Sequence, residues 1–491
     1  MGKKGLTRSL FKRYNEEKIV RYTAMKKQAF NPYLPSWEYI PDGEPYVFGD
    51  RVYVYGSHDY YNGHVFCMGD YMGWSAPVDD LSDWRCEGVI YPRTADPLNA
   101  DGRMCLYAPD VTQGPDGRYY LYYVLDKVSV VSVAVCDTPA GRYQFLGYVH
   151  YKDGTRLGDR PGDEPQFDPG VLTEGDTTYL YTGFCGQWDK SRHGAMVTVL
   201  ESDMVTIREE PRFVVPSCQY SEGTGFEGHA YFEAASIRKR GDTYYFVYSS
   251  EKMHELCYAT SKSPVEGFCY GGVIVSNNDL GISSYKPADM PIAAGGNNHG
   301  SIVEIKGQWY IFYHRQTNNT WYSRQGCAEP IFFDENGQIP QVEITSCGLN
   351  GCVLEGEGEY PAYIACHLHA PGFLPMVGYH MQPHIKQEGR DDDKNIGYVG
   401  HIINGTVIGF KYFDCKDVKA FGLTVRGYAN GVFEVRTEMD GEVLAQIKTD
   451  NSNVWVEHVV PCRIPDGKQS LFLTYKGGGD NGAVKSIRFI K

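Results

Sequence analysis

The sequence predicts an all-β protein, a five-bladed β-propeller followed by a β-sandwich, and two features of its 491 residues carry the prediction. The chain holds 39 tyrosines and 56 glycines, a composition typical of aromatic strands separated by tight turns. A glycine turn followed by an aromatic strand also occurs five times, at Gly49, Gly117, Gly175, Gly241 and Gly307. Successive copies start 58 to 68 residues apart, which leaves room for four short strands in each, as in a propeller blade.

A titratable residue lies at nearly the same distance before each turn glycine. The residues, seven or eight positions before their glycines, are Asp42, Asp110, Asp168, Glu233 and His299. The first strand of each propeller blade lines the central channel, so equivalent positions meet around the axis. Acids near hairpin starts are common, but turn chemistry readily explains only one or two of the five. We therefore expect all five side chains at one mouth of the channel.

Paired carboxylates in a pocket are the apparatus of glycoside hydrolysis, in which one carboxyl donates a proton and the other activates water or attacks directly. Glu233 stands in the apolar segment 231–237, which favours a raised pKa, so it is the expected acid. Asp42 lies among prolines and glycine and is the expected base. Glu44 and Glu227 do not fit the repeat spacing and are rated below these two.

His299 leaves several alternatives open, one of which is a hydrogen bond to a sugar. It could ligate a channel cation, for which Ca²⁺ fits nearby oxygen ligands better than Zn²⁺. It could equally order a water molecule or a carboxylate. No sequence motif for an organic cofactor occurs. Trp74 and Trp188 could stack on sugar rings or belong to the core.

The net charge of −14 argues against a nucleic-acid partner and suits a neutral partner such as a sugar, although it also fits plain solubility. No apolar run reaches membrane-spanning length, and residues 1–30, an expected N-terminal arm, show no secretory signal. The 14 cysteines form no regular pattern. These features predict a cytoplasmic protein that acts on an oligosaccharide.

Short strands recur from residue 397 onward with Gly, Asp and Asn turns, a pattern typical of a β-sandwich. The expected organisation is therefore an arm at 1–30, a propeller at 31–348 and a sandwich at 349–491.

Several motifs together resemble glycoside hydrolase family 43, in family order from about residue 31 to about residue 345. They are Asn31-Pro32, Pro41-Asp42, Tyr107-Ala108-Pro109-Asp110, Phe167-Asp168-Pro169, Phe232-Glu233-Ala234 and Asn298-His299-Gly300-Ser301. The resemblance implies a five-bladed propeller and an inverting mechanism. By position, Asp42 matches the general base, Glu233 the general acid, and Asp168 the carboxylate that tunes and orients that acid.

Three further residues are implied to contact substrate. Asp110 matches a recurrent second-blade aspartate outside the catalytic three, and Arg324 is similar to an arginine that contacts the terminal sugar. His299 matches an axial histidine beside calcium or water in the channel.

The sequence Phe-Glu-Ala-Ala around Glu233 is closer to arabinofuranosidase-like members of the family. It therefore favours release of terminal L-arabinofuranose from arabinoxylan- or arabinan-derived oligosaccharides. The alternatives are a β-xylosidase, alone or combined with that activity, and a non-catalytic sugar-binding propeller. Segments 404–413 and 477–481 are similar to a family 6 carbohydrate-binding module, and whether this domain binds sugar stays open.

Overall fold

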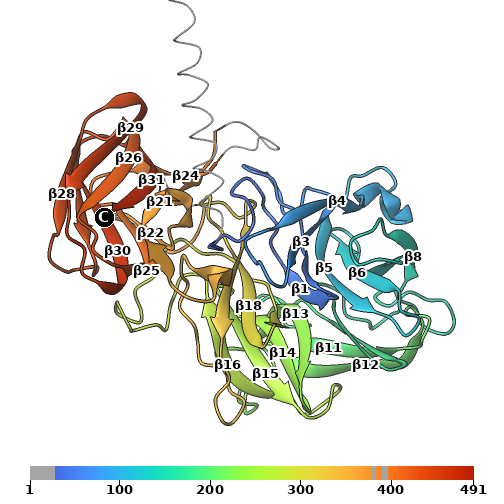
Figure 1. The fold of residues 1–491 in the computed structure, drawn as a ribbon. Coiled ribbons are helices and arrows are strands. Elements are labelled where there is room, and N and C mark those ends of the chain that lie inside the picture. The colour runs from blue at the N-terminus through green and yellow to red at the C-terminus, as the bar shows by residue number, and fades with distance from the viewer. Residues whose placement is uncertain (1–27, 379–381, 389–395) are drawn as a thin grey trace, which may run out of the picture.

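The computed structural model describes residues 28–378, 382–388 and 396–491. Most of the expected N-terminal arm, residues 1–27, lies outside this range. Figure 1 shows the chain as two adjoining bodies, one coloured blue to yellow and the other orange to red. No helix among the described residues is long and apolar enough to cross a membrane.

Five antiparallel sheets make up the first body, each built from strands consecutive in the chain (Figure 1). The first two are β1 (Glu44–Phe48), β2 (Arg51–Tyr55), β3 (Tyr71–Pro77), β4 (Arg85–Tyr91), and β5 (Leu106–Gln113), β6 (Tyr119–Leu125), β7 (Val131–Cys136), β8 (Gln144–Tyr148). The next two are β9 (Gly170–Glu174), β10 (Thr177–Thr182), β11 (Gly194–Leu200), β12 (Ile207–Pro216), and β13 (Tyr231–Arg240), β14 (Thr243–Ser250), β15 (Glu255–Ser261), β16 (Cys269–Ser276). The fifth has three strands, β17 (Ile302–Ile305), β18 (Gln308–Arg315) and β19 (Gln325–Ile331).

The repeated turn glycine joins the first and second strands of every blade. All five glycines have a positive φ, between 59° and 85°, which a residue with a side chain adopts only at a cost. This requirement explains why the glycine recurs at the same place in each repeat.

Each pair of neighbouring blades shares one hydrophobic core. Tyr123 and Tyr71 join blades one and two, and the pattern continues around the ring. The fifth core closes the circle, because Phe312 of blade five packs with Val54 and Trp74 of blade one. Trp74 is therefore a core residue, 5% exposed, and its ring is not available to stack on a sugar.

Residues just before blade one also complete blade five. The Tyr33 backbone N–H donates to the Gly326 carbonyl (3.2 Å), beside β19. The Asn31 side chain accepts from the Ala328 N–H and donates to the Ala328 carbonyl, both at 2.9 Å. The predicted propeller is thus confirmed, with this segment beside the third strand of its last blade.

Two six-stranded sheets form the second body, the predicted sandwich. One contains β20 (Leu354–Gly356), β22 (His367–His369), β25 (Val407–Cys415), β27 (Gly431–Arg436), β28 (Ala445–Thr449) and β30 (Gly467–Gly477). The other contains β21 (Gly358–Pro361), β23 (His384–Lys386), β24 (Tyr398–Ile402), β26 (Ala420–Tyr428), β29 (Ser452–Pro461) and β31 (Asn481–Ile490). The boundary predicted near residue 350 falls in the connection between β19 and β20.

The sandwich is bonded to the propeller by buried groups. Lys411 of β25 forms an ion pair with Asp279 (3.2 Å), and both side chains are fully buried. The Ile385 N–H donates to the Thr317 carbonyl (2.9 Å). These contacts fix the sandwich beside blades four and five.

Candidate active site

Four of the five predicted positions converge where the innermost strands begin. Asp42, Asp168 and His299 come just before β1, β9 and β17, and Glu233 is the third residue of β13. All four are buried, with 3% to 8% of their surface exposed. Asp168 links the set, because its Oδ2 lies 3.6 Å from His299 Nδ1 and accepts from the Ala234 N–H at 3.1 Å.

The backbone around these carboxylates is unusual. Asp42, Asp168 and Ala234 have φ values of 57°, 43° and 67°, in the left-handed region that costs residues with side chains about 1 kcal/mol or more. The pairing of β13 with β14 also shifts register on both sides of Glu233, as in a β-bulge. Such features re-aim side chains, and here they occur at the three residues expected to do the chemistry.

Asp42 is held as an anion. Burial raises its pKa, but Arg324 and His314 outweigh burial and lower the pKa below its ordinary value. Arg324 Nη1 lies 2.9 Å from Asp42 Oδ1, and His314 Nδ1 lies 3.2 Å from the same oxygen. An ionised carboxylate is what a general base requires.

Glu233 has the opposite character. Burial, with added repulsion from Asp168 and Asp42, raises its pKa to about 8, against lowering contributions from His299 and Asn297. The Asn297 side-chain amide lies 3.5 Å from Glu233 Oε1. Glu233 is therefore protonated at neutral pH, as a general acid must be.

The pKa values of Asp168 and His299 are both raised above their ordinary values. Burial and Asp42 raise the pKa of Asp168 to about 7, although His299 lowers it. Burial lowers the pKa of His299, but Glu44, Asp168 and Asp42 outweigh it and bring the value to about 9. His299 thus carries a positive charge beside Asp168 at neutral pH.

Asp110 belongs to a separate, fully buried group. Its Oδ1 accepts from the Tyr46 hydroxyl and its Oδ2 from the Val171 N–H, both at 2.7 Å. Unlike Asp42 and Asp168, which precede their strands, it is the fifth residue of β5, and the pairing with β6 shifts register just before it. Equal spacing from the turn therefore does not place it beside the other four, and its role as a substrate contact stays a prediction.

Glu44 also lies in the channel, where it binds Arg238. Arg238 Nη2 lies 2.6 Å from Glu44 Oε2, and the guanidinium stacks 4.1 Å from the Tyr46 ring centroid. The other oxygen, Oε1, and His299 Nε2 are buried, have no hydrogen-bond partner among the described residues, and lie 3.8 Å apart. These two atoms fit a water molecule, or a cation that takes most of its ligands from water. Glu227 is exposed and belongs to neither group.

A series of aromatic rings includes the residues that directly precede two of the carboxylates. Tyr107 contacts Phe167, Phe167 contacts Phe184, and Phe184 contacts both Phe232 and Trp188. The ring centroids in these pairs lie 5.1 to 6.3 Å apart. Phe167 and Phe232 directly precede Asp168 and Glu233. Trp188 is 75% exposed, so its ring is available to a ligand.

Three further residues belong to the site and are not predicted by the repeat spacing: His314, Asn297 and Asp59. His314 stands on the second strand of blade five, and Asn297 stands in the loop before β17, so neither shares the repeat position. Asp59 holds Arg324 from the side opposite Asp42, with its Oδ2 2.8 Å from Nε. No local sequence signal marks these three residues.

The chain is similar to several known proteins. Residues 42–339 match the family described as Glycosyl hydrolases family 43. A xylosidase/arabinosidase from Thermoclostridium stercorarium is 65% identical over 469 residues, covering 94% of this chain and 99% of that protein. A xylosidase/arabinosidase from Bacteroides ovatus is 29% identical over 347 residues, covering 63% of this chain and 97% of that protein.

Solved structures show the same fold. The family 43 arabinoxylan arabinofuranohydrolase from Bacillus subtilis, in complex with cellotetraose, superposes with a TM-score of 0.51 at 20% identity, covering 94% of this chain and 97% of that one. The GH43_1 enzyme from Xanthomonas citri, complexed with xylose, gives 0.50 at 24% identity, covering 63% and 92%. The family match spans Asp42, Asp168 and Glu233. The chain therefore belongs to family 43 of the glycoside hydrolases.

Proposed function

We propose that the protein is an inverting, exo-acting glycosidase in which Asp42 is the general base and Glu233 the general acid. The opposite protonation states of these two buried carboxyls carry the proposal. Asp42 takes a proton from water, whose oxygen bonds to the anomeric carbon while the bond from that carbon to the glycosidic oxygen breaks. Glu233 gives its proton to the departing oxygen, and exchange with solvent restores both groups.

Asp168 acts through its neighbours in this scheme. Its charge raises the pKa of Glu233, and its hydrogen bond from the Ala234 N–H fixes the backbone next to Glu233. We therefore assign it the tuning and orienting role.

The proposed substrate is an oligosaccharide with terminal L-arabinofuranose, derived from arabinoxylan or arabinan. The name of the Thermoclostridium stercorarium relative, xylosidase/arabinosidase, supports this class and equally supports a β-xylosidase or a combined activity. A further structure of the Xanthomonas citri enzyme holds xylotriose. A non-catalytic sugar-binding propeller fits less well, since it has no need of an acid and a base with separated pKa values.

Arg324, His299 and Asp110 are the proposed substrate contacts. Arg324 and His299 lie beside the carboxylates, whereas Asp110 would act from the second blade. For the sandwich we propose a carbohydrate-binding role. Its buried contacts with the propeller also support a packing role.

The test compares p-nitrophenyl α-L-arabinofuranoside with p-nitrophenyl β-D-xyloside and follows the first-formed product anomer by NMR. We expect turnover of the arabinofuranoside with inversion. Turnover of the xyloside alone would move the assignment to a β-xylosidase, and a product of retained configuration would remove Asp42 as base. Inactivity on both and on pentose oligosaccharides would leave the binding propeller.

We also propose a calcium ion in the channel, held largely through water by Glu44 and by His299, whose imidazolium would release its Nε2 proton to solvent as the ion enters. When bound, it would add positive charge beside the carboxylates. Because Arg238 already neutralises one oxygen of Glu44, we expect removal with a chelator to lower activity only a few-fold, with recovery on adding Ca²⁺. Unchanged activity and an unchanged melting temperature after chelation would indicate that water, and not calcium, lies between Glu44 Oε1 and His299 Nε2.

We also propose that the protein is cytoplasmic. All 14 cysteines are free thiols, as in proteins of reducing compartments. Substrate would then be an imported oligosaccharide, and recovery of the protein from the culture medium of its host would contradict this.

A further inference from the structure

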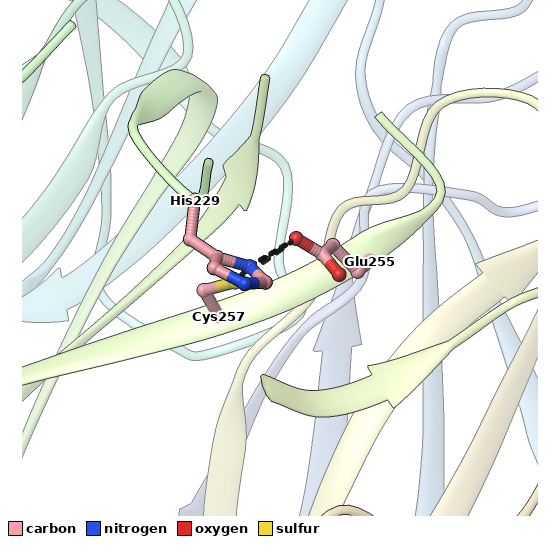
Figure 2. Close-up of side chains that lie close together, drawn as sticks. All are labelled: His229, Glu255 and Cys257. Atoms are coloured by element: carbon pink, nitrogen blue, oxygen red, sulfur yellow. Dashed lines mark hydrogen bonds and ion pairs between the residues drawn. The ribbon is translucent and has the colours of Figure 1, made fainter. Parts of the chain in front are cut away.

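Three metal-ligating side chains meet in blade four, outside the catalytic cluster (Figure 2). His229 lies in the turn before β13, and Glu255 and Cys257 are the first and third residues of β15. Because alternate residues of a strand face the same side, β15 presents the carboxylate and the thiol together. The imidazole reaches the same point from the neighbouring segment, as Figure 2 shows.

The donor atoms are close enough to share one ion. His229 Nδ1 lies 2.6 Å from Glu255 Oε1, and Cys257 Sγ lies 3.8 Å from that nitrogen and 3.6 Å from that oxygen. In a tetrahedral zinc site with bonds of about 2.0–2.3 Å, ligand atoms lie about 3.3–3.6 Å apart. To match this geometry, only the distance between His229 Nδ1 and Glu255 Oε1 would have to increase, by roughly 0.7 Å.

The surroundings hold these side chains in place. Cys257 and Glu255 are 0% and 4% exposed. The Ser250 hydroxyl donates to Glu255 Oε1 at 2.6 Å, and the Tyr270 ring stacks on the imidazole with centroids 5.1 Å apart. Among the described residues, the hydrogen-bond partners of the thiol lie between 3.6 Å, for Glu255 Oε1, and 4.0 Å, for the Tyr270 hydroxyl. The buried thiol makes only long contacts and faces an imidazole and a carboxylate. A thiophilic metal ion could bind all three groups at once.

Lys252 competes for the same place. Its Nζ lies 3.3 Å from His229 Nε2 and 3.9 Å from Glu255 Oε1. Without metal, His229 donates from Nδ1 to Glu255 and accepts from Lys252 at Nε2. The Lys252 side chain is 43% exposed, so it can turn into solvent.

We propose that His229 Nδ1, Glu255 Oε1 and Cys257 Sγ bind a Zn²⁺ ion, with water as the fourth ligand. On binding, the Cys257 thiol loses its proton to solvent, and the imidazole proton moves from Nδ1 to Nε2 as Lys252 withdraws. The ion would tie the start of the first strand of blade four to its third strand. Since His229 lies four residues before Glu233, it would also anchor the segment that leads into the catalytic acid.

The experiment uses the full chain, reduced and stripped of metal with a chelator. Co²⁺ is titrated in as a spectroscopic probe, and Zn²⁺ then displaces it. We expect one Co²⁺ per chain, a thiolate-to-cobalt charge-transfer band, the intense visible bands of a tetrahedral site, and a higher melting temperature with Zn²⁺. Absence of stoichiometric binding by the unmodified protein would overturn the proposal.

Three variants test the proposed site. Cys257→Ser should abolish the charge-transfer band and weaken binding at least tenfold, whereas Cys269→Ser, which changes an exposed thiol on β16, should bind as the unmodified chain does. Lys252→Met removes the competing cation and leaves all three ligands, so it should tighten Zn²⁺ binding several-fold. Binding unaffected by Cys257→Ser, or not tightened by Lys252→Met, would contradict this assignment, and neither readout depends on glycosidase activity.

Discussion

Arg324 holds Asp42 with one edge of its guanidinium and Asp59 with the other, at 2.9 Å from Asp42 Oδ1 and 2.8 Å from Asp59 Oδ2. The three side chains are almost completely buried. The base is therefore kept ionised by a cation that is itself fixed by a second carboxylate.

Replacing Arg324 with Met should shift the acid side of the pH–rate profile to higher pH. Asp42 has a lowered pKa, so its ionised form and the activity persist into acid, and both are lost as pH falls through that pKa. Without the guanidinium, burial would dominate and raise the pKa. Arg324→Lys should keep most of the low-pH activity, and an unshifted acid limb in the Met variant would show that another group holds Asp42 ionised.

Glu233→Gln should lower kcat for aryl glycosides with poor leaving groups by about 10²–10⁴-fold, since the proton donor is lost. Dinitrophenyl glycosides, whose leaving group needs little protonation, should lose far less. The folded protein should be as stable as before or more so above neutral pH. The folded pKa of Glu233 is raised from 4.5 to about 8, so its carboxyl costs stability as pH rises through this range.

Asp168→Asn should move the basic limb of kcat/KM to lower pH. Glu233 must be protonated, so activity falls as pH rises through about 8, and the charge of Asp168 contributes to that value. Removing the charge lowers the pKa of Glu233 and narrows the active range. A variant with reduced activity but an unmoved basic limb would limit Asp168 to orientation.

Trp188 and Trp74 should respond differently to replacement with Ala. Trp188 is exposed, so Trp188→Ala should leave the free energy of unfolding within about 0.5 kcal/mol of the original and raise KM for oligosaccharides more than for aryl pentosides. Trp74→Ala should cost about 3–5 kcal/mol, because its indole fills the core that closes the ring. Denaturant titration and KM for substrates of different length provide the two measurements.

The Glu44–Arg238 pair offers a double-variant test. Arg238→Met alone leaves a buried carboxylate without its cation and should destabilise the protein by about 3–5 kcal/mol. Combining it with Glu44→Gln should recover much of that loss, because the unpaired charge is gone. Equal losses in the single and double variants would show that the arginine stem, rather than its charge, supports the channel.

The repeat made much of this site predictable from the sequence. Every blade needs a glycine at this turn because the backbone there adopts a left-handed conformation. The glycine therefore recurs in each repeat, and the distance back from it locates Asp42, Asp168, Glu233 and His299. Asp110 does not follow the same rule. It is the fifth residue of its strand, whereas Glu233 is the third of its own, and its carboxylate is bonded to Tyr46 and Val171; spacing alone does not predict how far along the channel a residue lies.

Long-range partners could not be predicted. Arg324 and Asp59 are 265 residues apart, and nothing in either local sequence indicates the other. His314 is one polar residue near the end of an aromatic strand, and its contact with Asp42 depends on how blade five closes on blade one. The contacts of Asp42 and Asp59 in blade one with Arg324 and His314 in blade five therefore form only when the ring closes.

That closure has a consequence for the order in which the protein can fold. Asn31 is made early, but Ala328, which it binds, follows 297 residues later. At about 5–20 residues per second, roughly 15–60 s pass during synthesis before the two can meet. Until then blades one to four can grow only as an open arc, and Asp42 has neither Arg324 nor His314 beside it. The last blade to leave the ribosome therefore completes both the ring and the charge state of the first catalytic residue.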